Sequence, residues 1–183
     1  YVVPLPRYDN YEHTVSAGFD FKNTDSPLFY NAAGLQLLQN NIDVDQFTLD
    51  YSGQLRDKYG ATAFSLGGVY SPGDMSSHNN NNDFNEFAPG ATADYGYARG
   101  EVRRETILPA RFSLYNRIAG QYSPQKLVPS ETFGLGGFAT VRGYNERVVN
   151  GDGGFLISTE IRTPAIVLRN ITGKEDARDW FML

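Results

Sequence analysis

The feature that most constrains this fold is strict alternation of apolar and polar residues in two segments, residues 14–22 and 47–56. In the first, every second residue is apolar, as in Phe19 and Phe21, and the residues between are polar or glycine. Since side chains of a β-strand point alternately to its two faces, this period predicts strands with one apolar face. Four more segments follow it less strictly, with interruptions at Arg104 and Asn116: residues 62–70, 98–107, 112–122 and 154–162.

The six predicted strands are joined by connections that alternate between long and short. The long ones are residues 23–46, 71–93 and 123–153, and the short ones are residues 57–60 and 108–111. In an antiparallel sheet whose strands pair in sequence order, alternate connections lie at opposite ends. The sequence therefore predicts an all-β, up-and-down antiparallel sheet with its long loops at one end. Transmembrane β-barrels of the outer membrane have this asymmetry.

Strand length and charge favour a membrane barrel over a soluble sandwich. The predicted strands run for ~9–11 residues, which is enough to cross an outer membrane with tilt. One face of residues 98–107 carries a ladder of charges, made of Arg99, Glu101, Arg103 and Glu105. A water-filled lumen accepts such a ladder, whereas a small soluble core would not. On strand pattern alone, a soluble barrel or sandwich stays open.

Composition excludes several classes of binding site. The chain of 183 residues has a formal net charge of −5, which argues against a general nucleic-acid-binding surface. It has no cysteine, which excludes a disulfide framework and a thiolate metal site. Because the pattern shows no internal boundary, we interpret residues 1–183 as a single partial barrel domain.

Few segments have a helical pattern. Residues 31–40 could form a short helix, although Gly34 makes a loop or a strand extension equally compatible. The four asparagines at residues 79–82 are expected to form an exposed, flexible surface loop. Asp43 and Asp45 precede a predicted strand and are expected to lie in a solvated loop.

No motif points to catalysis, a metal or a cofactor. Residues 134–137 are glycine-rich, but no Lys-Ser or Lys-Thr follows, so a phosphate-binding loop is not expected. Residues 150–154 lack the acidic spacing of a calcium loop and are expected to form a turn. His13 and His78 lie far apart in sequence, which argues against a histidine-based site. We therefore do not expect an enzyme.

The longest connection carries the most specific motif. It reads Ser-Glu-Thr-Phe-Gly-Leu-Gly-Gly-Phe at residues 130–138 and Val-Arg-Gly-Tyr at residues 141–144, and the following strand ends in Glu-Ile-Arg-Thr-Pro at residues 160–164. With this combination the chain resembles the two-partner-secretion transporters, the haemolysin activation/secretion (ShlB/FhaC/HecB) branch of the Omp85 superfamily. The resemblance covers most of the chain and is strongest over residues 98–164.

The resemblance implies a larger barrel preceded by periplasmic POTRA domains, so we expect this chain to be an internal fragment. It also implies that the motif loop folds into the lumen, where Arg142 pairs with an acidic residue of the barrel wall. The family places that acid on the strand after residues 160–164, which we expect to be missing here, and Glu160 is the substitute within the chain. The expected lumen-loop motif comprises Gly136, Gly137, Val141, Arg142, Gly143 and Tyr144, with Gly143 permitting a tight tip and Tyr144 packing at it.

The expected lumen wall has two interpretations. Its candidate residues are Arg99, Glu101, Arg103, Glu105, Glu160 and Arg162. We favour cross-strand ion pairs that stabilise the wall, worth ~0.2–1 kcal/mol each. The other interpretation is weak contact with a passing unfolded polypeptide.

The resemblance implies a translocation pore in the bacterial outer membrane that exports a large partner exoprotein of the adhesin or haemolysin type. Its partners would be that unfolded polypeptide and outer-membrane lipid, without nucleic acid, and it would need no cofactor. One alternative is an Omp85-type factor that assembles other outer-membrane proteins, because such factors share the Val-Arg-Gly-Tyr tip. Another is a soluble β-barrel or sandwich that binds a ligand at its long loops.

Overall fold

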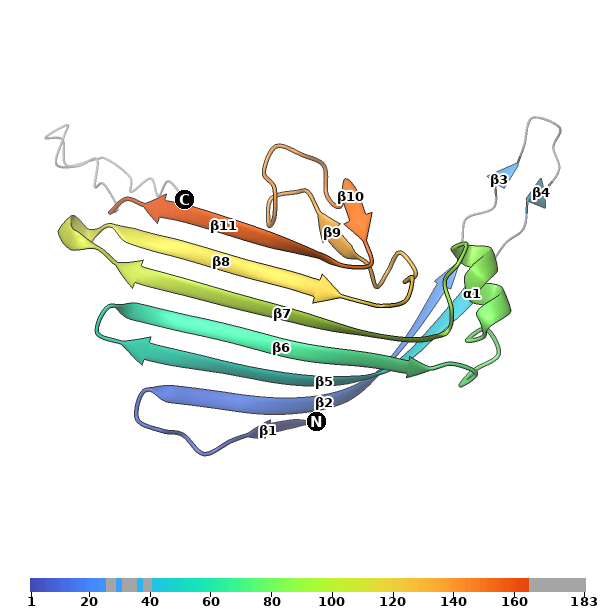
Figure 1. Ribbon diagram of the computed structural model, residues 1–183, viewed down its shortest axis with the longest axis horizontal. Helices are drawn as coiled ribbons and strands as arrows, with labels where there is room; N and C mark the ends of the chain where they lie inside the picture. Colours follow the sequence, from blue (N-terminus) through green and yellow to red (C-terminus); the bar gives the residue numbers. More distant parts are fainter. Residues whose placement is uncertain (26–28, 31–35, 38–40, 165–183) are drawn as a thin grey trace, which may run out of the picture.

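The computed structural model describes residues 1–25, 29–30, 36–37 and 41–164. Its main element is a seven-stranded antiparallel sheet in the order β1-β2-β5-β6-β7-β8-β11 (Figure 1). The strands are β1 (Val2–Pro4), β2 (Tyr11–Asp25), β5 (Asn41–Asp57), β6 (Gly60–Pro72), β7 (Asp94–Ile107), β8 (Ser113–Tyr122) and β11 (Gly154–Arg162). The other described elements are the hairpins β3–β4 (Phe29–Tyr30 and Gln36–Leu37) and β9–β10 (Phe133–Leu135 and Val149–Gly151), the helix α1 (Asn81–Phe87) and the 3-10 turn η1 (Pro109–Arg111).

The predicted all-β, up-and-down architecture is confirmed. Each of the six predicted segments lies in a strand of the large sheet, except that Phe112 precedes β8. The strand β1 adds a seventh by pairing Val3 with Val15 of β2. Neighbouring strands follow one another in sequence, apart from the short hairpins inserted in the long connections. Among the described residues the sheet is not closed, because β1 and β11 form its two edges.

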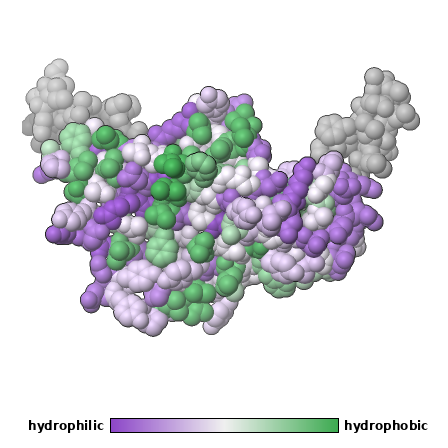
Figure 2. Space-filling view, viewed as in Figure 1, coloured by the Kyte–Doolittle hydropathy of each residue, from purple (hydrophilic) through white to green (hydrophobic). Residues whose placement is uncertain are grey.

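The predicted alternation of connections is also confirmed. The β5–β6 turn and η1 lie at one end of the sheet, whereas α1 and the β9–β10 hairpin lie at the other (Figure 1). The end that carries α1 is mostly hydrophilic in the space-filling view (Figure 2). The part of the chain that the structure describes contains no helix long and apolar enough to cross a membrane.

The two faces of the sheet differ in chemistry. On one face, which we call the outer face, the register places Val102, Ile118 and Ile157 side by side, and all three are exposed. On the opposite, inner face, the neighbouring row contains Glu101 on β7, between Ser65 of β6 and Ala119 of β8. A contiguous apolar surface of this kind is a site for contact with lipid or another protein.

A buried core lies on the inner face at the end with the long loops. There, α1 and the segment after β8 fold back over β5, β6 and β7, so that Phe84 and Val128 are almost fully buried. The core comprises Ile42, Val44, Val69, Phe84, Ala91, Ala93, Tyr95, Tyr97, Leu127 and Val128. The long connections therefore cover the inner face at this end.

The prediction of an exposed, flexible loop for the asparagine run was wrong in part, because Asn81 and Asn82 are exposed but begin the helix α1. Asn79 is fully buried, and its side-chain amide donates a hydrogen bond to the backbone carbonyl of Asp43 at 2.9 Å. Asn80 caps α1 by accepting hydrogen bonds from the N–H groups of Asn82 and Asp83. Side-chain oxygens of asparagine satisfy the free N–H groups of a helix start, and this signal was missed because α1 has only seven residues.

The prediction of a solvated loop at Asp43 and Asp45 was also wrong. Both belong to β5 and are 6% and 3% exposed. Here β5 extends past the end of its pairing with β6. The loop after β6 replaces β6 as its hydrogen-bonding neighbour, because the Asp43 N–H donates to the His78 carbonyl at 3.1 Å. The Ser76 hydroxyl donates to both carboxylates. The possible helix at residues 31–40 lies outside the described residues, except for β4.

Candidate functional site

The predicted motif lies in the connection between β8 and β11, which folds into a base and a tip. The base, residues 123–132, runs along the inner face and buries Leu127 and Val128 in the core. The hairpin β9–β10 then pairs Leu135 with Val149. The tip, residues 136–148, joins these two short strands and contains Val-Arg-Gly-Tyr.

The base is fixed across the sheet by Glu131, whose carboxylate is buried. It accepts hydrogen bonds from Lys22 of β2 at 3.0 Å and from the Tyr97 hydroxyl of β7 at 2.9 Å. Burial on its own opposes ionisation, but the hydrogen bonds from Lys22 and Tyr97 outweigh it, so the pKa of Glu131 lies below its ordinary value. Glu131 belongs to the motif at residues 130–138 but was not among the predicted site residues, and its position in the Ser-Glu-x-Phe phrase was the only signal for it in the sequence.

A second contact closes the neck between base and tip. The Arg147 guanidinium donates hydrogen bonds to the backbone carbonyls of Pro129 and Thr132, both at 3.0 Å. It also reaches the Thr132 hydroxyl at 2.9 Å. The C-terminal end of the tip is therefore held to the base by one side chain.

The tip is held in shape by hydrogen bonds within itself. The Gly137 N–H donates to the Tyr144 carbonyl at 3.1 Å, and the Phe138 N–H donates to the Glu146 carboxylate at 3.1 Å. Gly136 and Gly137 have φ of 121° and 86°, and Gly143 has φ of 91°. These left-handed conformations favour glycine, which accounts for the glycines in the motif.

Substitution of Gly137 by Ala should disorganise the tip. The new methyl group would collide with the Glu146 carboxylate, and φ of 86° is itself strained for any residue with a Cβ. We expect a cost of about 1–3 kcal/mol, seen as faster proteolysis within residues 136–148 of the folded full-length protein. Gly143→Ala is the matched control, because it carries the same backbone strain whereas the space around it is open. The additional proteolysis of Gly137→Ala over Gly143→Ala then measures the displacement of the Glu146 carboxylate. Equal proteolysis of the two variants would contradict the role of the Glu146 contact.

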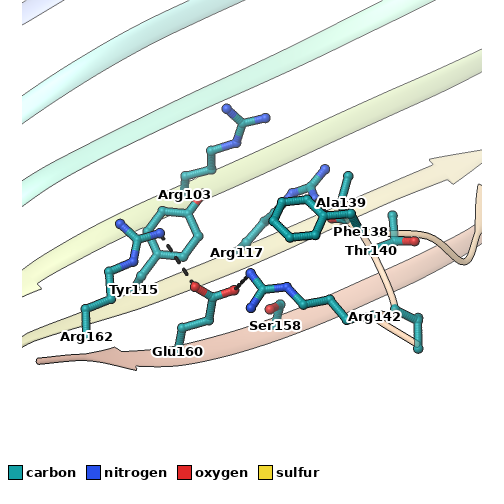
Figure 3. Close-up of a pocket in the computed structure, with 11 residues that line it drawn as sticks. Arg103, Tyr115, Arg117, Phe138, Ala139, Thr140, Arg142, Ser158, Glu160 and Arg162 are labelled. Carbon is teal, nitrogen blue, oxygen red and sulfur yellow. Dashed lines mark hydrogen bonds and ion pairs between the residues drawn. The ribbon is translucent and has the colours of Figure 1, made fainter. Parts of the chain in front are cut away.

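The tip contacts the inner wall through Arg142 (Figure 3). Its guanidinium donates to the Glu160 carboxylate of β11 at 2.7 Å and lies 5.0 Å from the centre of the Phe138 ring. From the wall, Arg117 of β8 donates to the Ala139 carbonyl at 2.6 Å. Arg142 thus has an acidic partner within this chain, and that partner is Glu160, the substitute expected from the sequence. Val141 borders the same space, whereas the Tyr144 side chain, expected to pack at the tip, is 64% exposed.

The candidate wall residues form ion pairs with one another, with Arg117 and with Asp50. Glu101 binds both Arg103 and Arg117, the latter at 2.8 Å. Arg162 lies 3.6 Å from Glu160 and 4.0 Å from Glu105, and Arg99 lies 3.6 Å from Asp50 of β5. Among these pairs, Glu101 with Arg117 joins the neighbouring strands β7 and β8, whereas the pair of Arg99 with Asp50 and that of Arg162 with Glu105 each skip one strand. Cross-strand ion pairs are therefore present on this wall, and their contribution to its stability stays a prediction.

A cavity of about 530 Å³ lies between the tip and the wall, beside these contacts (Figure 3). It is lined by Arg103, Tyr115, Arg117, Phe138, Ala139, Thr140, Val141, Arg142, Ser158, Glu160 and Arg162. The tip contributes a ring and a guanidinium, and the wall contributes three more arginines. This lining suits contact with polypeptide carboxylates or aromatic rings, and it lacks the paired acid and base of a hydrolytic site.

A family model described as haemolysin secretion/activation protein ShlB/FhaC/HecB matches residues 5–174. The chain belongs to this family. The match confirms the resemblance to two-partner-secretion transporters that the motif suggested. No curated protein and no solved structure gives a significant match.

Proposed function

We propose that the chain forms part of a translocation pore in the bacterial outer membrane, which exports a large unfolded partner protein in two-partner secretion. The proposal rests on one observation above all. In a member of the haemolysin secretion/activation family, the Val-Arg-Gly-Tyr tip lies on the charged inner face and is held there by Arg142 and Glu160. This arrangement suits a loop that occupies the pore and can be released from its wall.

Two further features support a membrane pore. The exposed apolar side chains of the outer face, such as Leu66 and Phe155, suit contact with lipid. The inner face carries ion pairs across several strands, which suits a water-filled interior. In this proposal the protein is not an enzyme and needs no cofactor. Its partners are the exported polypeptide and lipid.

The contact between tip and wall is weak enough to be reversible. The side chains of Arg142 and Glu160 are 61% and 29% exposed, and a partly exposed ion pair contributes about 1 kcal/mol at most. Its loss therefore changes the ratio of bound to released tip by about fivefold. Together with the hydrogen bond from Arg117 to the Ala139 carbonyl, a contact of this strength holds the tip in place without preventing its displacement.

Arg142→Ala in the full-length protein is the direct test. We expect the tip to leave the wall more often, with altered pore conductance in lipid bilayers and reduced release of the partner protein into the medium. Lys126→Ala, which removes an exposed positive charge from the base of the same loop, should change neither. Exchange of the pair, Arg142→Glu with Glu160→Arg, should restore part of the function. Unchanged export and conductance in Arg142→Ala would contradict the proposed role of the tip.

The alternative of an assembly factor for other outer-membrane proteins shares the Val-Arg-Gly-Tyr tip. The lead-in at residues 130–138 and the family match both favour secretion. The two functions separate in one experiment. Loss of the protein should abolish release of one exoprotein in secretion, whereas in assembly it should lower the levels of many outer-membrane proteins.

A further inference from the structure

The charges of the inner wall are not presented equally to the interior. In the pair of Arg99 with Asp50, the arginine side chain is 53% exposed and the carboxylate 32%. In the pair of Arg103 with Glu101, the corresponding values are 54% and 19%. The pair of Arg142 with Glu160 follows the same order. In these three pairs the arginine is the more exposed partner. The pair of Arg117 with Glu101 is nearly balanced, at 21% and 19%, and in the pair of Arg162 with Glu105 the carboxylate is the more exposed partner, at 50%.

This difference in exposure gives the wall beside the tip a positively charged surface, although the chain as a whole carries a negative charge. The chain has a formal net charge of −5, yet a side chain that approaches the wall between β7 and the tip meets arginine first. Each guanidinium has five N–H donors in a planar fork, so one bound carboxylate leaves donors for a second. Glu101 and Glu160 are each shared by two arginines, which leaves more donors still.

The cavity places aromatic rings among these arginines. Tyr115 lies under Arg162, with 4.2 Å from its ring centre to the guanidinium carbon, and Phe138 lies beside Arg142. Both rings border the cavity of about 530 Å³, which is large enough to admit a side chain. Exposed guanidinium–carboxylate contacts are individually weak, so a polypeptide could make and break them one after another as it moved.

We propose that this arginine-covered wall is an interaction surface for acidic side chains of the exported polypeptide. The proposal rests on the proposed function, because it assumes that a polypeptide passes along the inner face. Carboxylates of the passing chain bind the exposed donors of Arg99 and Arg103, and near the tip they compete with Glu160 for Arg142. Acidic segments are therefore retained at the wall, and basic segments are repelled.

The test uses the full-length protein in planar lipid bilayers at low salt, with deca-glutamate and deca-lysine peptides as probes of the open pore. Deca-glutamate should block the current at a lower concentration than deca-lysine. The double variant Arg99→Gln, Arg103→Gln should raise the half-blocking concentration of deca-glutamate by about fivefold. Arg104→Gln is the matched control, because Arg104 neighbours Arg103 but lies on the outer face, paired with Asp57 at 3.0 Å.

A variant that is expected to strengthen the block by deca-glutamate controls for misfolding, because a misfolded pore would not bind the peptide better. Glu105→Gln removes the exposed acid of the wall and should lower the half-blocking concentration of deca-glutamate. Equal block by both peptides, no block by either, or a half-blocking concentration of deca-glutamate that is the same in the double variant and in Arg104→Gln would overturn the proposal. Normal export together with an unchanged deca-glutamate block in the double variant would overturn the acidic preference alone. Absence of any pore from the full-length protein would overturn the proposed function.

Discussion

Leu66→Arg should destabilise the full-length protein in its membrane by about 2–4 kcal/mol, the cost of an arginine on the lipid face near the bilayer midplane. Leu66 lies midway along β6 on the outer face and is 60% exposed. Its neighbours across the sheet are Tyr51 of β5 and Gly100 of β7, and neither carries a charge that could pair with the new guanidinium. In lipid the arginine would lose its hydration without finding a partner.

The adjacent residue supplies the matched control. Ser65 is also exposed, but it faces inward between Ser52 and Glu101, where water can hydrate a new guanidinium. Ser65→Arg should change stability by no more than about 0.5 kcal/mol. The measurement is equilibrium unfolding by urea in phospholipid vesicles, followed by heat-modifiable gel mobility. If Leu66→Arg were as mild as Ser65→Arg, the outer face would not contact lipid, and the soluble alternative would be favoured.

The strands of this fold could be predicted because their signal is local. Alternation such as that of Phe19 and Phe21 depends only on which face a residue occupies, and the sheet keeps that pattern along the predicted segments, whereas at the end with the long loops apolar residues such as Val44 and Val69 line the inner face as well. Even Arg104, which breaks it, stays in register, and its pairing with Asp57 and Thr62 shows how an outer-face charge is satisfied near the short turns. The extra length of β5 could not be predicted, because its first residues are covered by a loop more than thirty positions away, as the bond from Ser76 to Asp43 shows.

The candidate site also has features that the sequence predicts and contacts that it does not. The glycines of the tip follow from local backbone geometry and from the resemblance, so the position of the motif in a long loop was predictable. The contacts of that loop with the sheet join distant positions. Lys22 is 109 residues from Glu131, and Tyr97 is 34 residues away. No periodicity in the sequence marks such pairs, and only the folded sheet brings β2 and β7 to the same loop base.

Glu131→Ala should release the base of the loop from the sheet, which is the second large effect that we expect. Lys22 is 44% exposed on its side chain and can be rehydrated. The Tyr97 hydroxyl cannot, because Tyr97 is buried, and an unsatisfied buried donor costs about 1–3 kcal/mol. The measurement is limited proteolysis of the folded full-length protein, with new cleavage expected within residues 123–132. Glu86→Ala, at an exposed glutamate of α1 near the same end, should leave the cleavage pattern unchanged.

Acid should have the same effect as that substitution. The folded-state pKa of Glu131 is lowered from an ordinary value of 4.5, so its ionised form contributes stability that is fully present above about pH 4.5. This stability is lost as the pH falls through the lowered pKa, because the proton then binds the unfolded state more readily than the folded one. Glu131→Gln removes the titrating group, and proteolysis of the base should then depend less on pH below 4.5 than it does in the unmodified protein. If acid opened the base equally in both proteins, another carboxylate would have to control it, and Glu131 would not be the residue that fixes the loop.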